Sequence, residues 1–562
     1  MQEQNGVAAT QLQLGAQPNL SEKNGTTTRL PYLKPANVLG KLLMDHPYML
    51  LGGFRPGADS ETLLTTFWEN YKLEQPSHKV YASPSRRLKR TIPIYLHGDG
   101  GRTQKKQPLE VLSMEPVLGL NTSQGAEETC RCSVPVAFGS NNLENPIAQK
   151  LNSKNNSFLT KFLIFAFPSK KYKRQPNLLI SLHEAASKNL AEVCKHGLMA
   201  KGERFYAAIL GYKADFEYHA KFGSLERSYM HAGRTQQLGV CHECWAGTPD
   251  IPFEDPSTRA LWTDTVCASF PWKETPPFKH IPFEAWESLP SRAPQFYRRD
   301  PFHVFRLGVA RNYAASVILL LAHFELFDYG DASESKSVES RLDRAWNNLM
   351  LYCESERLHL GTLRSFSKDK LHYGSGFTFP YLGCKGADSV IILKWLLFYT
   401  GLVLMSVEES DPMKHTLEVI QQGLRGGLNF TQGIHKHALW LPRSCIKHLK
   451  GGLHDFCYAY GFLAHFALRH NLHLFGQVPK IHALARFKVE MFQAMANKSR
   501  RWMLNPASTD CSQNEDFIGR VAKISRRISY KNNRHQFERT LLQRYQMKAK
   551  MVIKQFKSKH QL

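Results

Sequence analysis

The sequence predicts an α/β fold whose sheet is interrupted, and then followed, by helices. Apolar runs at 92–97, 108–114, 161–167 and 204–212 have the length and composition of strands, and a single helical segment separates the last two. A Cys-bearing segment comes next, and beyond about residue 300 the apolar residues recur at helical spacing. Strands first and helices later are typical of a sheet core that carries a large helical addition.

Five segments follow from this pattern. Residues 1–30 are rich in Gln, Asn, Gly and Thr and are expected to be disordered. Residues 31–90 are expected to form a small helical segment that ends in a basic linker. The sheet core with its Cys-x-x-Cys insertion should occupy 91–300, the helical insertion 301–510, and a C-terminal helix with a basic tail 511–562.

Within the core, the runs 92–97 and 108–114 should pair as a hairpin, because a Gly- and Lys-containing turn joins them. The segment 177–196 has apolar residues at helical spacing and should cross over to the strand at 204–212. Helices are expected at 303–328, 336–357, 388–406, 411–424, 454–470 and 479–498.

The charge of the chain favours a polyanionic partner. Lys and Arg number 73 against 48 Asp and Glu, which gives a formal charge of +25, so nucleic acid or an anionic membrane face is the expected partner class. Basic clusters could contact phosphates, form an ordinary solvated face, or serve nuclear import. The candidate phosphate-contacting residues are Arg86, Arg87, Lys89, Arg90, Lys170, Lys171, Lys173, Arg174, Arg526 and Arg527.

The cysteine count and the hydropathy pattern indicate a soluble protein of a reducing compartment. Eleven cysteines, an odd number, are scattered along the chain rather than arranged as a disulfide framework. The N-terminus lacks the pattern of a secretory signal. The most apolar run, 389–405, is interrupted by Lys394 and is interpreted as a buried core helix rather than a membrane span. No membrane association is expected.

Two aspartates stand at predicted strand ends. Asp99 follows the strand at 92–97, and Asp215 follows the strand at 204–212. Carboxylates that converge from different strands can hold the divalent ions used in phosphodiester chemistry. The alternative is that both are turn or helix-cap residues, positions that Asp favours.

Several motifs, in order along the chain, resemble CACTA-type and Plavaka-type DNA transposases, which are related to the Kyakuja-Dileera-Zisupton group. The run that ends in Asp99-Gly100 resembles their first β-hairpin, and Ala208-Ile-Leu-Gly-Tyr-Lys-Ala-Asp215 resembles the strand that carries their second acid. Cys241-His-Glu-Cys244 is similar to the Cys-x-x-Cys that follows it. Asp300-Pro-Phe-His303 and Asn514-Glu515-Asp-Phe-Ile-Gly519 are similar to their later Asp-x-x-His and Glu-x-Phe-Leu-Gly segments.

This resemblance implies an RNase-H-like mixed sheet, with a zinc-binding loop and a large helical insertion before the third acid. The three metal-binding catalytic acids would be Asp99, Asp215 and Glu515, with Asp516 and Asp300 as alternatives for the third. They would hold Mg²⁺ or Mn²⁺ and act on DNA in the nucleus, and the protein could form a homo-oligomer. A domesticated, catalytically silent relative that binds nucleic acid or chromatin is the alternative.

Two further sites follow from local patterns. Cys241 and Cys244 have the spacing of half a zinc site, with Cys267 as a tentative third ligand; the alternative is a pair of free thiols. Histidines between 435 and 482 are interpreted as core or surface residues rather than ligands. Asp300 and His303 are expected in a supporting role beside the acids, with helix capping by Asp300 as the alternative.

Overall fold

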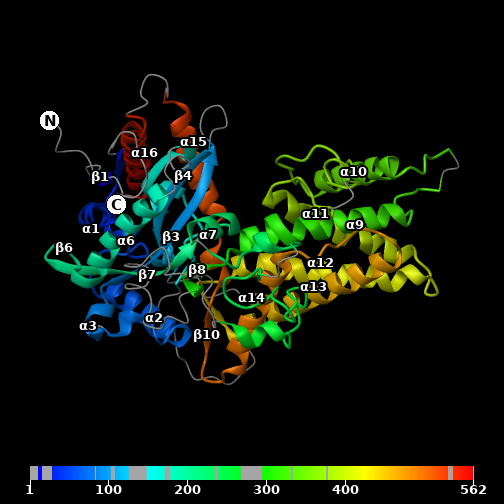
Figure 1. Ribbon diagram of the computed structural model, residues 1–562, viewed down its shortest axis with the longest axis horizontal. Helices are drawn as coiled ribbons and strands as arrows, with labels where there is room; N and C mark the ends of the chain where they lie inside the picture. The colour runs from blue at the N-terminus through cyan, green and yellow to red at the C-terminus, as the bar shows by residue number, and fades with distance from the viewer. Residues whose placement is uncertain are drawn as a thin grey trace.

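The computed structural model describes residues 10–14, 28–82, 84–102, 108–125, 149–170, 177–223, 225–234, 238–266, 294–330, 333–374, 378–528 and 536–560. Its centre is a mixed α/β arrangement around a six-stranded sheet (Figure 1). The strands lie in the order β5-β4-β3-β7-β6, and β8 also pairs with β7. Their bounds are β3 Thr91–Arg102, β4 Pro108–Pro116, β5 Phe162–Pro168, β6 Leu198–Ala200, β7 Glu203–Lys213 and β8 Tyr297–Arg298.

The four long strands lie where the apolar runs predicted them. β3 and β4 form the expected antiparallel hairpin, and β5 continues it antiparallel to β4. β7 runs parallel to β3, as a strand that returns through a crossover helix must, and β8 runs parallel to β7. Residues of β4 and β5 are buried on both faces of the sheet, which explains why their sequences are nearly continuous apolar runs.

Helices cover the sheet. The crossover helix α6, Asn177–His196, has the predicted bounds and packs on β7 and on α1, Pro35–Asp45. α2, Ala58–Glu74, holds the start of β3, because the Trp68 indole N–H donates to the Thr91 carbonyl at 2.8 Å. α15, Ser512–Arg526, packs beside β3, and α16, Phe537–His560, packs beside β5.

The N-terminal segment departs from expectation in one place. Residues 10–14, inside the range expected to be disordered, form strand β1, Thr10–Leu14, which pairs antiparallel with β2, Thr28–Tyr32. The alternation of Leu12 and Leu14 with polar neighbours is the period-two pattern of a strand. The rest of 1–27 lies outside the described residues.

A helical block extends from one side of the sheet (Figure 1). It begins with a π-helix, η8, that runs directly into α9, and two short strands, β9 and β10, pair with each other beside it. Its elements are η8 Phe302–Val309, α9 Ala310–His323, α10 Val338–Ser355, α11 Gly386–Ser406, α12 Pro412–Lys436, β9 Trp440–Pro442, α13 Arg443–Arg469, α14 Pro479–Ala496 and β10 Trp502–Leu504.

Helices α12 and α13 are longer than the sequence predicted, and glycine explains the difference. The predicted helices are 411–424 and 454–470, and Gly-Gly pairs at 426–427 and 451–452 lie in the gap between them. Such pairs often interrupt helices. In the structure the two helices cross there: a Cβ atom on Gly426 would lie 2.4 Å from the Gly452 carbonyl oxygen. The glycines allow close helix packing and do not end either helix.

Two described helical stretches, Phe302–His323 and Gly386–Ser406, are long and apolar enough to cross a membrane by length and composition alone. The first is 78% buried over its apolar window, as expected of a core helix; the second is only 39% buried. Phe398, Leu402 and Met405 of α11 are exposed, so the helix predicted to be a core helix at 389–405 has one apolar face open to solvent.

Candidate functional site

The register of the parallel strands brings the two predicted aspartates to the same edge of the sheet. His97 of β3 pairs with Lys213 of β7, so Asp99 and Asp215 each follow that pair by two residues. Asp215 also caps α7, Phe216–Phe222, by accepting a hydrogen bond from the Tyr218 N–H at 2.7 Å. The cap interpretation and the edge position are therefore both correct for Asp215.

Gly98 has a steric role beside Asp99. A Cβ atom at this position would lie 2.0 Å from the Tyr212 hydroxyl oxygen and 2.4 Å from a ring carbon of Tyr218. These two stacked tyrosines fill the α6 side of the sheet, and the Tyr212 hydroxyl lies 3.1 Å from His183 Nε2. Since side chains alternate along a strand, Asp99 lies on the opposite face, in line with Tyr95 and His97.

The third acid reaches Asp99 from the far end of the chain. Glu515 lies in the first turn of α15, and its carboxyl group is hydrogen-bonded to Asp99. The neighbouring acid, Asp516, points elsewhere: it accepts hydrogen bonds from Ser157 Oγ at 2.8 Å and from Arg520 Nε at 2.7 Å. Of the alternatives for the third acid, the structure therefore brings Glu515, and not Asp516, to Asp99.

The acids perturb one another. Burial raises the pKa of Asp99 well above its usual range, and the hydrogen bond and charge of Glu515, followed by the charge of Asp215, raise it further. The pKa of Glu515 is also raised, by burial and then by the charges of Asp300 and Asp215, against the opposing effect of its bond with Asp99. Two carboxyl groups in hydrogen-bond contact must share a proton. A divalent cation could replace that proton, since carboxylate oxygens suit Mg²⁺ and Mn²⁺.

The three acids are not a compact ligand set by themselves. Among the described residues, Asp99, Asp215 and Glu515 do not form a group whose ligand oxygens all lie within 4.8 Å of one another. In two-metal sites the ions are themselves about 3.5–4 Å apart. Ligands spread around two ions can therefore be further apart than ligands around one ion.

Asp300 and His303 lie beside Glu515, and Asp300 also caps the helix that follows it. The Asp300 carboxylate lies 2.5 Å from His303 Nδ1 and accepts hydrogen bonds from the backbone N–H groups of Phe302 at 2.8 Å and Cys511 at 3.0 Å. His303 Nε2 lies 3.5 Å from Glu515 Oε1. Burial would lower the pKa of His303, but its bond to Asp300 and the charges of Asp300, Asp99 and Asp215 raise it. A charged His303 would favour the ionised form of Glu515.

The Cys-x-x-Cys pair forms a second cluster with a histidine that is distant in sequence. Cys241, Cys244 and His482 are buried, and their ligand atoms all lie within 4.8 Å of one another. Cys244 Sγ is 3.3 Å from His482 Nε2. Tetrahedral zinc, with Zn–S of about 2.3 Å and Zn–N of about 2.0–2.1 Å, would place these two atoms about 3.5 Å apart. The group could therefore bind a metal ion.

Each thiol of the pair changes how readily the other loses its proton. The hydrogen bond from Cys244 lowers the pKa of Cys241 well below its usual range, and His482 adds to this against the effect of burial. Burial and the neighbouring Cys241 raise the pKa of Cys244. The Glu243 N–H also points at Cys241 Sγ, at 3.4 Å. A cation that binds both sulfurs as thiolates would displace their protons.

Sequence reasoning missed His482, although it belongs to the histidines between 435 and 482. His482 is buried, as the interpretation of these histidines as core or surface residues allows, but it also faces Cys244 from near the start of α14, 238 residues away in sequence. No local spacing links the two positions, so only their packing identifies the ligand. Cys267, the tentative third ligand, lies outside the described residues.

Several of the basic residues predicted to contact phosphate also hold the linker to the core. Lys89 and Arg90 both pair with Glu61 of α2, at 2.8 and 2.7 Å, and Arg90 also pairs with Glu203 of β7 at 3.1 Å. The Arg87 guanidinium lies over the Tyr206 ring at 4.7 Å. These contacts tie the linker to α2 and β7, and phosphate contact by these three partly exposed residues stays a prediction.

The other basic candidates are surface residues where the structure describes them. Lys170, Arg526 and Arg527 are exposed, and Arg526 Nε donates to the Arg102 carbonyl at 3.1 Å. The side chain of Arg86 is outside the described part of the chain, and so are Lys171, Lys173 and Arg174.

Comparison of the sequence with protein-family models and curated proteins identifies no match. Function must therefore be inferred from the residues and their geometry.

Proposed function

We propose that the chain is a transposase-derived protein that acts on DNA by metal-dependent phosphodiester hydrolysis or strand transfer. The observation that carries this proposal is the contact between Asp99 and Glu515. The resemblance selected these two residues from short motifs at opposite ends of the chain, and their carboxyl groups are hydrogen-bonded. Asp215 lies at the same sheet edge, because β3 and β7 are parallel and His97 pairs with Lys213.

The sheet supports the proposal as well. Three antiparallel strands followed by two parallel ones, in the order β5-β4-β3-β7-β8, match what an RNase-H-like core would require. In such a core Asp99, Asp215 and Glu515 would hold Mg²⁺ or Mn²⁺, which activates the attacking oxygen and stabilises the leaving one. His303, fixed by Asp300, orients Glu515 and holds a proton at Nδ1.

We further propose that the metal of the second cluster is a structural zinc. Two cysteines and a histidine are typical zinc ligands, and all three are buried. The zinc would fix the segment after Asp215 to helix α14 and so restrict the orientation of α7, which Asp215 caps. Nuclear localisation and a DNA partner are part of the same proposal, supported by the charge of +25.

A catalytically silent, nucleic-acid-binding protein on the same scaffold is the second candidate. The spread of the three acids beyond 4.8 Å favours it. The two candidates differ in chemistry and not in fold, so a cleavage assay separates them.

The test uses end-labelled duplex DNA with Mg²⁺ or Mn²⁺, comparing the full chain with Asp99→Asn, Asp215→Asn and Glu515→Gln. Each variant keeps the side-chain volume and removes one charge, so nicking or strand transfer should be lost while DNA affinity is kept. Asp516→Asn is the matched control, because Asp516 is adjacent to Glu515 but bonds to Ser157 and Arg520. Wild-type protein without metal-dependent cleavage would favour the silent candidate, and cleavage that survives Asp215→Asn would contradict the assignment of the acids.

A further inference from the structure

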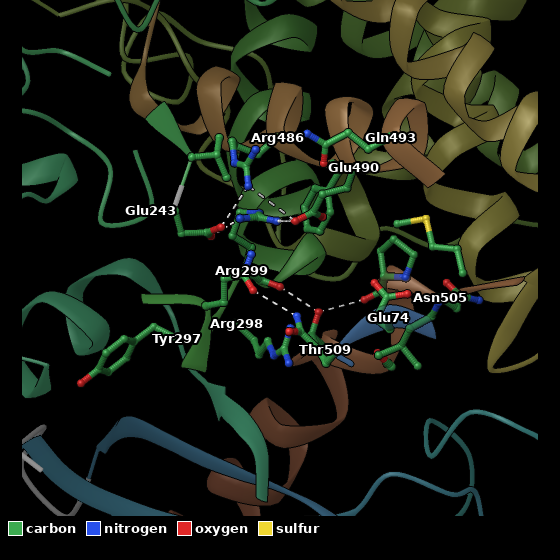
Figure 2. A pocket seen from close by; sticks show the side chains of 18 of the residues that line it. Glu74, Glu243, Tyr297, Arg298, Arg299, Arg486, Glu490, Gln493, Asn505 and Thr509 are labelled. Atoms are coloured by element: carbon green, nitrogen blue, oxygen red, sulfur yellow. Dashed lines mark hydrogen bonds and ion pairs between the residues drawn. The ribbon is translucent and has the colours of Figure 1, made fainter. Parts of the chain in front are cut away.

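A polar cavity of about 390 Å³ lies between β8, the end of α2, helix α14 and the segment 503–509 (Figure 2). It contains neither the three acids nor the Cys-His cluster. Its lining is rich in charge, with four arginines and three glutamates: Arg298, Arg299, Arg486, Arg500, Glu74, Glu243 and Glu490. Four positive and three negative side chains give the described lining a net charge of +1.

Three of the arginines contact glutamates. Figure 2 shows Arg299 and Arg486 directed toward Glu243 and Glu490 from two different elements. Arg486 Nη2 lies 3.1 Å from a Glu243 oxygen, and Arg500 pairs with Glu74 across the cavity. These pairs compensate each other's charge, so the excess charge must belong to the fourth arginine.

Arg298 is that uncompensated cation. Its guanidinium donates to the Leu210 carbonyl, at 3.0 and 2.7 Å, and to the Tyr71 hydroxyl at 3.0 Å. Among the described residues no carboxylate lies within ion-pair distance of it. Its side chain packs against Gly211, where an added Cβ atom would lie 2.7 Å from the Arg298 side chain. Arg298 is half-buried, and in this part of the chain its guanidinium is held by neutral oxygens alone. An anion in the cavity would offset its charge.

The cavity also contains unused hydrogen-bond donors. Nε of Arg299 and both Nε and Nη1 of Arg486 are buried without a partner in the described part of the chain. Arg486 is 1% exposed, so bulk water does not satisfy these donors. Ordered water could accept from them, but water would leave the charge of Arg298 uncompensated. An anion with several acceptor oxygens satisfies both requirements.

We propose that this cavity is a binding site for a small phosphorylated ligand. Phosphate oxygens match the planar donor fork of arginine, and the donors of Arg299 and Arg486 add to the uncompensated charge of Arg298. The volume accommodates a phosphate or diphosphate group with a modest organic part. The site is independent of the proposed cleavage of DNA, because none of its residues is one of the acids. It is connected to them through the chain, since Arg299 directly precedes Asp300 and its carbonyl accepts from Thr509 Oγ1 at 2.7 Å.

The experiment measures binding of sodium pyrophosphate, ADP and inositol monophosphate to the full chain by calorimetry and thermal unfolding, in buffer without added divalent metal. Sodium sulfate at matched ionic strength controls for general anion effects, and the three probes distinguish an inorganic, a nucleotide and an inositol source. We expect at least one probe to raise the melting temperature by about 2 °C at a hundredfold excess over its Kd.

Arg298→Gln should weaken that binding about tenfold or more, because it removes a charged donor. Arg469→Gln removes the same group from an exposed position on α13 and should bind as wild type does. Gln493→Glu places a negative charge on an exposed lining residue, so it should weaken binding of the probe without disturbing the buried ion pairs. If Arg298→Gln does not fold, Gln493→Glu tests whether the probe binds in this cavity.

Three outcomes would overturn the proposal: no binding of any probe, equal stabilisation by sulfate, or unchanged affinity in Arg298→Gln and Gln493→Glu. Asp99→Asn should bind the probe as wild type does. If Asp99→Asn alone abolished binding, the phosphate would lie at the acids and the cavity would be excluded, whereas failure of DNA cleavage would leave the cavity untouched.

Discussion

Replacement of His482 by glutamine tests the link between the Cys-x-x-Cys loop and the helical block. Glutamine retains a polar side chain of similar reach but lacks the imidazole nitrogen that faces Cys244 at 3.3 Å. The variant should lose bound zinc, because two thiolates alone are half of a tetrahedral site. It should also lose stability, because the metal joins parts of the chain that are 238 residues apart.

The size of that loss follows from loop closure. Cross-linking a loop of this length removes chain entropy from the unfolded state worth about 5.5 kcal/mol in the chain-entropy model. For 562 residues the entropy of unfolding is about 1.2 kcal/mol per kelvin, so the melting temperature should fall by about 4–5 °C. Wild-type protein treated with a strong chelator should show the same fall.

Zinc content by elemental analysis and the melting temperature by differential scanning calorimetry measure the two effects. His465→Gln is the matched control: His465 belongs to the same run of histidines but is exposed on α13, so it should keep both its zinc and its melting temperature. Freshly purified wild-type protein without zinc, or a His482→Gln variant that retains the metal, would refute the reasoning.

Three other outcomes are expected. Glu115→Gln should cost about 3–5 kcal/mol of unfolding free energy in urea, because Glu115 is buried between Lys161 and Lys213, the latter at 2.5 Å; a loss below 1 kcal/mol would contradict this. Burial lowers the pKa of His78 to about 4; a hydrogen bond to Ile209 opposes this shift and the charge of Arg298 adds to it. Just below pH 6.5, therefore, the unfolded state takes up a proton at His78 and the folded state does not. The free energy of unfolding should fall by up to about 3.4 kcal/mol between pH 6.5 and 4. His78→Gln should flatten this dependence, and an unchanged slope in urea unfolding at several pH values would argue against it. If the C-terminal helix contacts duplex DNA, replacing three exposed lysines by glutamine should reduce the log–log salt slope of binding by up to about 2.7, measured by fluorescence anisotropy, whereas an unaltered slope would place the contact elsewhere; these are Lys548, Lys554 and Lys559.

The choice of lysine substitutions reflects a finding about the tail. The sequence indicates a basic C-terminus that could be deleted to test DNA binding. In the structure α16 is part of the core: Leu541 and Leu542 are buried, and the Tyr545 hydroxyl accepts from the Leu163 N–H of β5 at 3.1 Å. Deletion would remove a core helix, so point substitutions on its exposed face are the cleaner test.

Local pattern determined most of the sheet and its candidate acids. The strand runs, the hairpin and the bounds of α6 follow from periodicity and turn chemistry, which act between residues a few positions apart. A strand end is visible in the same way, so Asp99 and Asp215 could be selected before their positions were known. The spacing of Cys241 and Cys244 likewise indicates half of a metal site without further information.

Tertiary structure alone decided which distant residues complete those sites. Glu515 reaches Asp99, His482 reaches Cys244, and Arg298 lines a cavity with Arg486 and Arg500, because helices and strands hundreds of residues apart pack together. The same holds for Gly426 and Gly452, which look like helix breakers and are points of close helix contact. Periodicity reports which face of an element is buried, but the partner of that face depends on packing of the whole chain, which no local pattern contains.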